Sequence, residues 1–410
     1  MLSFASDGGF PLQMASLSEL FDETRLVLPF SKRGFEAGEM PLIGHNLSIV
    51  PLTQRCGTGF SSKLSFLPWV LRNCGTILRE LLAADAVHSP IPGDVGTVGM
   101  LGAFTLCKPL FVRHCGNWLK PVTLAEKFWR WFMERFAGGR NVMLATGGTA
   151  APPSQKNRSI RWIFASSLSE QELRSYACER AYPPDGRIRL ILVARQKKAK
   201  GAGAVIQSLP LLAERFPNVS FEIVGEGSAI PEFRRLAEAL GLQDRVHFTG
   251  KLDHEQVMHC LKDATLFVFP TVSSDGFPKA VLEGLAAGLP VVGTRVSVLP
   301  QLIGNGCGVL IDKVTPEAVA QGVAAALGSA AAYEAMSRKA IETARQYSLE
   351  AWRDSIGEYL RDAWGTLRSG DRRHETGDGS EESEVRSQKS GVRGAEGQRS
   401  EVSNPVVGGP

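Results

Sequence analysis

The sequence predicts an α/β protein with two doubly wound domains, each a parallel sheet with helices on both faces. Its 410 residues, 43% of them hydrophobic, suffice for two cores of ordinary size. From Arg187 to about Ile311, short β-rich runs alternate with helical runs, which is the pattern of a parallel sheet covered by helices. The first half shows a weaker form of the same alternation.

The C-terminal half carries the clearer pattern. The strands that we expect there are Ile188–Val193, Val219–Val224, Arg245–Phe248, Thr265–Phe269, Pro290–Val292 and Val309–Ile311. Pro231 suits the first turn of a helix at Glu232–Leu240, and Gly241 can end that helix. Pro278 and Pro316 stand where two further helices would begin.

The N-terminal half is less regular. Here we expect a turn at Gly8 and Gly9, a helix at Met14–Phe21, and strands at Leu2–Ala5, Arg25–Phe30, Ala86–His88, Pro109–Val112 and Asn141–Ala145. Residues 150–157 read as a loop, and Tyr182–Gly186 reads as a linker. We therefore expect a Rossmann-like domain at 1–181, a second one at 182–346 and a terminal helix at 347–367.

The last segment, 368–410, contains no Leu, Ile, Met or aromatic residue. Such a composition has nothing to bury, so we expect a disordered tail. An acidic or basic interaction tail is the alternative, but positive and negative charges are mixed along it.

Charge and cysteine usage exclude some classes of function. The net charge of +4 does not require a nucleic-acid partner, although it suits anionic ligands or an anionic membrane surface. The seven cysteines form no C-x-x-C pair, so we expect neither a disulfide framework nor a zinc site. No signal-like or long apolar run is present, and we expect a cytoplasmic protein.

The strongest motif is a loop that enters a helix after the strand ending at Phe269. The first N–H groups of a helix lack partners inside it, so those of Gly276, Phe277 and Lys279 are candidates to hold a phosphate. Asp275 stands eight positions before Glu283, about two helical turns. One carboxylate would therefore lie at the mouth of the helix and the other deeper along it, where both could accept hydrogen bonds from hydroxyl groups.

This segment resembles a known family. Asp275-x7-Glu283, followed by Ala-Ala-Gly-Leu-Pro-Val-Val, is similar to the Glu-x7-Glu motif of glycosyltransferase family 4, whose members have the GT-B fold of two Rossmann-like domains. The resemblance implies that Asp275 binds the donor sugar and that Glu283 binds the ribose of the nucleotide. Asp275 is one methylene shorter than the usual Glu. The alternative is an amphipathic helix start with two solvated acids.

A basic loop follows the strand that ends at Val193. Fixed cations stabilise the charge that develops on a departing diphosphate, and Arg195 and Lys200 have the spacing of the family's diphosphate ligands. We expect Lys197 and Lys198 to face water. A solvated basic loop without a ligand is the alternative.

Weaker resemblances complete the nucleotide side of the site. The turn at Gly225 and Gly227 resembles the one that lines the family's nucleotide pocket, and Leu252 lies in a loop similar to the one beside the base. A Gly-x-Gly turn alone is weak evidence because many turns contain it.

In the N-terminal half, Gly8 and Gly9 resemble the family's glycine loop, which lets the backbone approach the donor phosphate or the acceptor. His114 and His88 end strands that resemble the acceptor side, and we favour His114 as the residue facing the transferred sugar. A histidine hydrogen-bonded at a strand end is the alternative for either.

An aromatic segment, Glu126–Phe136, allows two interpretations. Its stripe of Phe128, Trp131, Phe132 and Phe136 has helical spacing and favours a core helix. The flanking Lys and Arg residues also suit a membrane interface.

Together these features predict a glycosyltransferase, and the resemblance implies that it retains the anomeric configuration and needs neither a metal nor a cofactor. It would move a sugar from a nucleotide diphosphate donor to a hydroxyl of a glycan, lipid or small molecule, in the cytoplasm or at the inner face of the membrane. A nucleotide-sugar epimerase of similar fold and a non-catalytic ligand-binding relative are the alternatives.

Overall fold

The computed structural model describes residues 4–31, 39–55, 65–183, 186–273 and 276–368, without the side chain of Asp7. Asp275 and nearly all of the predicted tail therefore lie outside the described residues. So do the first two residues of the predicted strand Leu2–Ala5, and the first described strand, β1, is Ala5–Asp7.

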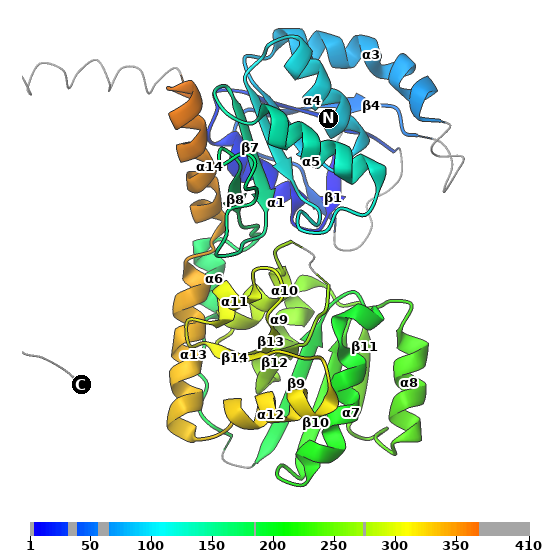
Figure 1. The fold of residues 1–410 in the computed structure, drawn as a ribbon, viewed down its shortest axis with the longest axis vertical. Helices are drawn as coiled ribbons and strands as arrows, with labels where there is room; N and C mark the ends of the chain where they lie inside the picture. Colours follow the sequence, from blue (N-terminus) through cyan, green and yellow to red (C-terminus); the bar gives the residue numbers. More distant parts are fainter. Residues whose placement is uncertain (1–3, 32–38, 56–64, 184–185, 274–275, 369–410) are drawn as a thin grey trace, which may run out of the picture. The chain divides into compact units, whose positions relative to one another are not determined.

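The C-terminal half contains one six-stranded parallel sheet with the order β11-β10-β9-β12-β13-β14 (Figure 1). Its strands are β9 (Arg187–Val193), β10 (Asn218–Val224), β11 (Val246–Gly250), β12 (Leu266–Phe269), β13 (Val291–Thr294) and β14 (Gly308–Ile311). All six strands were expected from the sequence. The order reverses direction between β9 and β12, which is the point where α/β sheets bind ligands.

The helices of this half are α7 (Ala202–Ala213), α8 (Ile230–Ala239), α9 (His254–Asp263), α10 (Lys279–Ala286), α11 (Leu299–Ile303), α12 (Pro316–Ala326) and α13 (Ala330–Arg345). As the sequence predicts, Pro231 lies in the first turn of α8 and Pro316 begins α12. Gly241 follows the end of α8 with φ +65°, the left-handed conformation that favours glycine after a helix.

The N-terminal half is built around a four-stranded parallel sheet of β5 (Val87–Ile91), β6 (Leu110–His114), β7 (Asn141–Thr146) and β8 (Arg161–Ile163). Two small sheets accompany it: β2 (Thr24–Pro29) pairs in parallel with β4 (Leu47–Leu52), and β1 pairs antiparallel with β3 (Glu39–Pro41). The sequence predicted β2, β5, β6 and β7 but not β3, β4 or β8.

Among the described residues, the helices that belong to this half or lead out of it are α1 (Phe10–Ser18), α3 (Phe66–Ala83), α4 (Asp94–Thr105), α5 (Leu124–Phe136) and α6 (Glu170–Tyr176). The predicted helix Met14–Phe21 was placed too late. Helix α1 begins four residues earlier because Pro11, whose missing N–H is harmless in a first turn, can start it.

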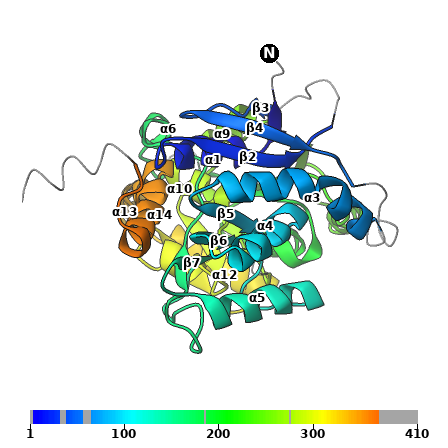
Figure 2. The ribbon, with the colours of Figure 1, turned by 90° about the horizontal axis from the view of Figure 1, so that it is seen from above.

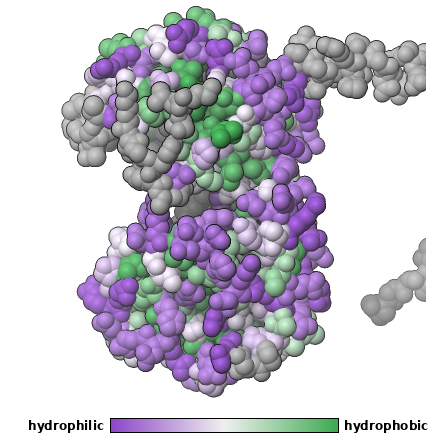
Figure 3. All heavy atoms as spheres, turned by 180° about the vertical axis from the view of Figure 1, so that it is seen from behind, coloured by the Kyte–Doolittle hydropathy of each residue, from purple (hydrophilic) through white to green (hydrophobic). Residues whose placement is uncertain are grey.

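Two separate hydrophobic clusters fill the two halves. The first joins α3, α4, α5 and the β5–β8 sheet, and the second surrounds the β9–β14 sheet. The second cluster already includes Leu168 and Leu173, which precede β9. On the face shown in Figure 3, hydrophilic residues dominate the lower half, and hydrophobic residues gather mainly in the upper half.

The terminal helix α14 (Leu349–Trp364) lies within the predicted terminal helix 347–367 and returns to the N-terminal half. It packs against α1, β7 and β8 (Figures 1 and 2). Trp352 is fully buried there, 4.9 Å from the guanidinium of Arg113. Arg113 donates to Gln13 Oε1 (3.0 Å), and Gln13 Nε2 donates to the carbonyl of Ser166 (2.8 Å). One chain of contacts thus links α14, β6, α1 and the segment before α6.

We predict that Trp352→Ala destabilises the protein by about 3–5 kcal/mol, as removal of a buried Trp does. Trp352→Phe should cost less, because the Trp352 Nε1 has no hydrogen-bond partner within the described structure and Phe removes that buried donor. Urea unfolding measures both. Trp131→Ala, at a Trp that is 54% exposed, is the control, and equal losses at the two positions would contradict the prediction.

Candidate functional site

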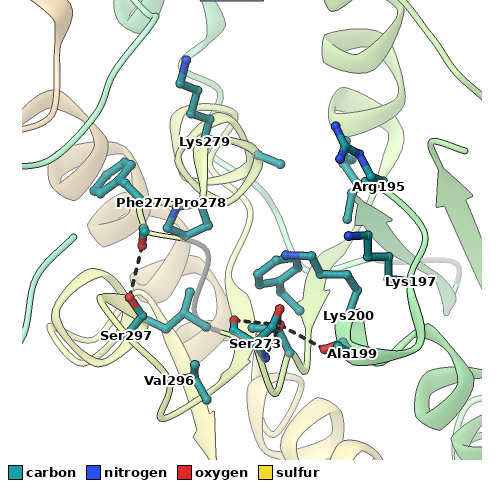
Figure 4. A pocket seen from close by; sticks show the side chains of 17 residues that line it. Arg195, Lys197, Ala199, Lys200, Ser273, Phe277, Pro278, Lys279, Val296 and Ser297 are labelled. Atoms are coloured by element: carbon teal, nitrogen blue, oxygen red, sulfur yellow. Dashed lines mark hydrogen bonds between the residues drawn. The ribbon is translucent and has the colours of Figure 1, made fainter. Parts of the chain in front are cut away.

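A pocket of about 620 Å³ opens at the carboxyl ends of β9 and β12. Figure 4 shows the side chains around it. Its lining comes from the basic loop after β9 (Val193, Ala194, Arg195, Lys197, Ala199, Lys200), from the segment after β12 (Phe269, Thr271, Ser273, Gly276, Phe277, Pro278, Lys279, Ala280) and from the loop after β13 (Val296, Ser297, Leu299). Parallel strands end at one edge of the sheet, so these loops meet where the strand order reverses.

Three cations form one side of the pocket. In Figure 4, Arg195, Lys197 and Lys200 extend close to one another from the basic loop. Lys200 is only 8% exposed, with its Nζ 5.3 Å from the centre of the Phe269 ring. Burial, together with the charges of Lys197 and Arg195, lowers the pKa of Lys200 to about 8. An anion in the pocket would relieve this repulsion.

The structure places the other two lysines of this loop differently. Lys198 faces outward, as predicted, and pairs with Glu232 at 2.7 Å. Lys197 is exposed, as expected, and it also lines the pocket. Residues 198–200 form a short 3-10 turn, which brings Lys197 and Lys200 to the same cavity.

Gly225 and Gly227 support this loop from the side of β10 instead of lining the pocket. A Cβ on Gly225 would lie 2.1 Å from the carbonyl oxygen of Ala194, and one on Gly227 would lie 2.1 Å from that of Gln196. Gln196 is fully buried and donates to Ala194 and Val224 carbonyls. Only glycine allows the two loops to pack this closely. Leu252 also lies outside the lining and packs against the second hydrophobic cluster.

Backbone donors form the opposite side of the pocket. Helix α10 begins at Lys279 after Pro278, without a side-chain cap. In the described part of the chain, the N–H groups of Phe277 and Lys279 have no backbone acceptor. The ring of Phe277 packs between Phe164 (6.0 Å) and Tyr347 (5.5 Å). The ring of Phe277 is thus engaged in aromatic packing, and its backbone N–H is the candidate contact for a ligand.

The side chain of Lys279 points away from Arg195 and Lys200 (Figure 4). It reaches Gly9, the residue before α1: a Cβ there would lie 2.5 Å from Lys279 Nζ. Burial lowers the pKa of Lys279, Glu283 opposes this shift, and Arg113 adds to it. The absence of a side chain at Gly9 thus leaves room for the ammonium group of Lys279. Its neighbour Gly8 is exposed and has φ +67°.

Glu283 lies one turn beyond Lys279 in α10, with its side chain 14% exposed. Burial raises its pKa, and the nearby His254 and Lys279 oppose the shift. Its Oε1 is 3.7 Å from Nδ1 of His254, the first residue of α9. The sequence analysis missed His254, although Asp253 before it is a recognisable helix cap. Ser273 and Gly276, which flank the undescribed 274–275, both line the pocket.

The two histidines are packed against aromatic rings. His114 ends β6, is 2% exposed and meets the Trp118 ring edge-on at 5.3 Å. Burial lowers its pKa to about 4. His88 stacks on Phe111 at 4.5 Å, and burial lowers its pKa well below the ordinary value. Neither lines the pocket, so the role of His114 toward the sugar stays a prediction.

Hydroxyl residues that the sequence analysis did not select tie these loops together. Thr271 donates to the carbonyl of Ala199 at 3.1 Å, which joins the segment after β12 to the basic loop. Ser297 donates to the carbonyl of Gly276 at 3.1 Å. Their only sequence signal is that each follows a strand closely.

Among the described residues no cluster of His, Cys, Asp or Glu could hold a metal ion, and no helix is long and apolar enough to span a membrane.

The fold has close counterparts among solved structures. Anabaena HepE, in complex with UDP and glucose, superposes with a TM-score of 0.64 over 88% of this chain and 97% of that one, at 16% identity. The architecture is thus that of the GT-B glycosyltransferases, with two Rossmann-like domains. Residues 179–345 match the family described as glycosyl transferases group 1.

Two curated relatives agree with this class. The chain is 27% identical over 316 residues to the alpha-D-kanosaminyltransferase of Streptomyces kanamyceticus, covering 72% of this chain and 81% of that enzyme. It is 29% identical over 145 residues to the amylovoran biosynthesis glycosyltransferase AmsK of Erwinia amylovora, covering 34% of this chain and 35% of that enzyme. The second alignment spans only about a third of either protein.

We predict that Lys200→Met stabilises the free protein at pH 7. The folded-state pKa of Lys200, about 8, lies below its ordinary 10.5, so the unfolded chain binds more protons between these values. Below pH 8 the buried lysine is charged, and the whole cost of burying this charge is subtracted from the free energy of unfolding. As pH rises from 8 toward 10.5, this cost becomes smaller. Thermal unfolding of both proteins from pH 7 to 10 should show a narrowing difference.

The control for this measurement is Lys197→Met, which removes an exposed charge from the same loop. It should change the melting temperature little at any pH. A destabilised Lys200→Met at pH 7 would contradict the prediction.

Proposed function

We propose that this protein is a retaining glycosyltransferase, which moves a sugar from a nucleotide diphosphate to an acceptor hydroxyl. The observation that carries the proposal is one pocket with cations on one side and, on the other, N–H groups of a helix start that have no backbone acceptor among the described residues. Both groups favour a diphosphate. UDP is the nucleotide to test first, because Anabaena HepE was solved with UDP and glucose.

In the proposed reaction, the bond between the sugar C1 and the diphosphate oxygen breaks, and its electron pair stays on that oxygen. Arg195 and Lys200 stabilise the new charge, and the N–H groups of Phe277 and Lys279 can share it. The acceptor oxygen then bonds to C1 on the same face of the sugar. Its proton passes to the departing phosphate, so atoms and charge balance without a metal or cofactor.

The remaining site residues receive their proposed roles from the motif resemblance. Glu283 would accept hydrogen bonds from the ribose, and Asp275 from hydroxyls of the donor sugar. His114, which is neutral at pH 7 because burial lowers its pKa to about 4, would face the transferred sugar. Gly8 and Gly9 would let the N-terminal half approach the same ligand.

Product analysis with a labelled UDP-sugar tests the reaction class. Transfer of label to an acceptor supports the proposal, and retention of the anomeric configuration supports the mechanism. An isomerised sugar would instead indicate the epimerase, and binding without turnover would indicate the non-catalytic relative.

We predict that Asp275→Asn and Glu283→Gln separate sugar from nucleotide recognition. Loss of the ribose ligand in Glu283→Gln should weaken UDP and UDP-sugar alike, by roughly ten- to a hundredfold for a charged hydrogen bond of about 1.5–3 kcal/mol. Asp275→Asn should leave UDP affinity nearly intact while it lowers turnover and sugar discrimination. Calorimetry with both ligands measures the difference.

Glu255→Gln, at an exposed acid in the first turn of α9, is the matched control for the acidic pair and should bind both ligands normally. Equal losses for UDP and UDP-sugar in Asp275→Asn would show that Asp275 does not recognise the sugar. Full activity in both test variants would remove the pair from the site.

We further propose that α5 attaches the protein to an anionic membrane. The predicted aromatic stripe is only partly buried. Phe132 lies in the core, while Trp131 is 54% exposed and Phe128 is 37% exposed. Leu124, one turn before Phe128, is 85% exposed, and Val122 is 79% exposed. Leu124, Phe128 and Trp131 thus form an exposed apolar surface at the spacing of one helix face, and Val122 lies just before the helix.

The charges around this surface favour anionic lipid. Lys120, Lys127 and Arg135 are exposed. The two acids of α5 are engaged: Glu126 accepts from the N–H groups of Val122 and Thr123, and Glu134 pairs with Arg130 and Lys156. Exposed leucine and tryptophan surrounded by such cations suit the headgroup region.

We predict that the protein sediments with vesicles of phosphatidylcholine and phosphatidylglycerol but hardly with phosphatidylcholine alone, and that added salt weakens this binding. Leu124→Ser and Trp131→Ser should reduce it severalfold. Leu211→Ser, at a residue 42% exposed on α7, should not. Unchanged sedimentation of both α5 variants would exclude this surface.

A further inference from the structure

Ser297 has an unusual backbone for its residue type. It lies in the loop between β13 and α11, lines the pocket and has φ +54°. Residues with a Cβ rarely adopt positive φ, and they persist there where the surrounding structure holds them or function requires it. Ser297 is one of only three such non-glycine residues in the described chain, with Asn46 and Cys107, and the only one of these that lines the pocket.

This conformation brings the Ser297 hydroxyl to the carbonyl of Gly276, to which it donates at 3.1 Å (Figure 4). The peptide unit between Gly276 and Phe277 is planar, so its N–H points opposite to its carbonyl. The hydrogen bond therefore fixes the direction of the Phe277 N–H. This is one of the N–H groups without a backbone acceptor among the described residues.

A second hydroxyl from the same side holds the start of this segment. Thr294, at the end of β13, donates to the carbonyl of Thr271, and Thr271 donates to Ala199 in the basic loop. The segment after β12 is thus held at Thr271 by Thr294 and at Gly276 by Ser297. Both anchors come from β13 and the loop that follows it, and neither hydroxyl needs to touch a ligand to set the geometry of the pocket.

We propose that Ser297 is a positioning residue: its left-handed backbone and its hydroxyl together orient the Phe277 N–H toward the diphosphate. This inference rests on the proposed function. The Ser297 hydroxyl then serves to orient the Phe277 N–H and not to stabilise the fold. A purely structural hydroxyl would change stability, whereas a positioning hydroxyl changes the affinity for the diphosphate and the rate of its departure.

Three variants separate the two roles. Ser297→Ala removes the hydroxyl and keeps the backbone strain, and Ser297→Gly removes both, because glycine adopts φ +54° freely. Ser297→Asn tolerates the left-handed conformation and keeps a donor. We expect kcat/KM for the UDP-sugar and the affinity for UDP to fall about three- to tenfold in the Ala and Gly variants, the effect of one neutral hydrogen bond. The Asn variant should recover part of both.

Melting temperatures make the test decisive. Ser297→Gly should melt no lower than Ser297→Ala yet bind UDP no better, so stability and affinity separate. Ser355→Ala, which removes a comparable hydroxyl-to-carbonyl bond in α14, should bind UDP normally. Wild-type UDP affinity in Ser297→Ala, or affinities that follow melting temperature, would overturn the inference.

The wild-type protein tests the underlying function separately. If it binds UDP but transfers no sugar, the proposed reaction fails, and the UDP affinities of the variants still decide the role of Ser297. If the wild-type protein binds neither UDP nor any other nucleoside diphosphate, both proposals are wrong.

Discussion

The candidate site depends on one constraint of parallel sheets, namely that all carboxyl ends lie at the same edge. β9 and β12 are neighbours in space but far apart in sequence. The strand order reverses between β9 and β12, and at such a reversal the loops that follow the two strands diverge and leave a crevice at the edge of the sheet. The basic loop and the start of α10 meet there, and the pocket requires no special side chain to exist. Its chemistry comes from which residues the two loops carry.

That chemistry has an energetic cost. Lys200 is buried beside Phe269, and Arg195 and Lys197 lie near it. The lowered pKa of Lys200 shows that burial and these two cations disfavour its charged form. A lysine on the surface would keep its hydration and would not reduce the stability of the protein. It would bind an anion weakly, however, because water screens exposed charges. Burial strengthens the attraction to a ligand by the same effect that destabilises the empty protein. Binding sites of this kind are built at the expense of stability.

The sequence predicts the C-terminal half well because its strands are continuous apolar runs that proline and glycine separate. The N-terminal half is harder: β8 has only three residues, Arg161–Ile163, and its pairing with β7 depends on contacts that local pattern does not reveal. Spacing alone placed Asp275 and Glu283 around the start of α10. It could not reveal that Lys279 reaches Gly9, or that Ser297, between two valines, leaves the extended conformation. Those features arise only from tertiary packing.

The return of α14 to the N-terminal half also affects how the chain can fold during synthesis. Trp352 completes a contact with Arg113 and, through it, with Gln13 in the first helix of the protein. The ribosome makes α1 and β6 long before it makes α14. The N-terminal half therefore lacks the helix that packs against it until the whole C-terminal half has been translated. Until then the surface of α1 that Trp352 and its neighbours cover stays open to solvent. The N-terminal half thus becomes complete only after the C-terminal half has been synthesised.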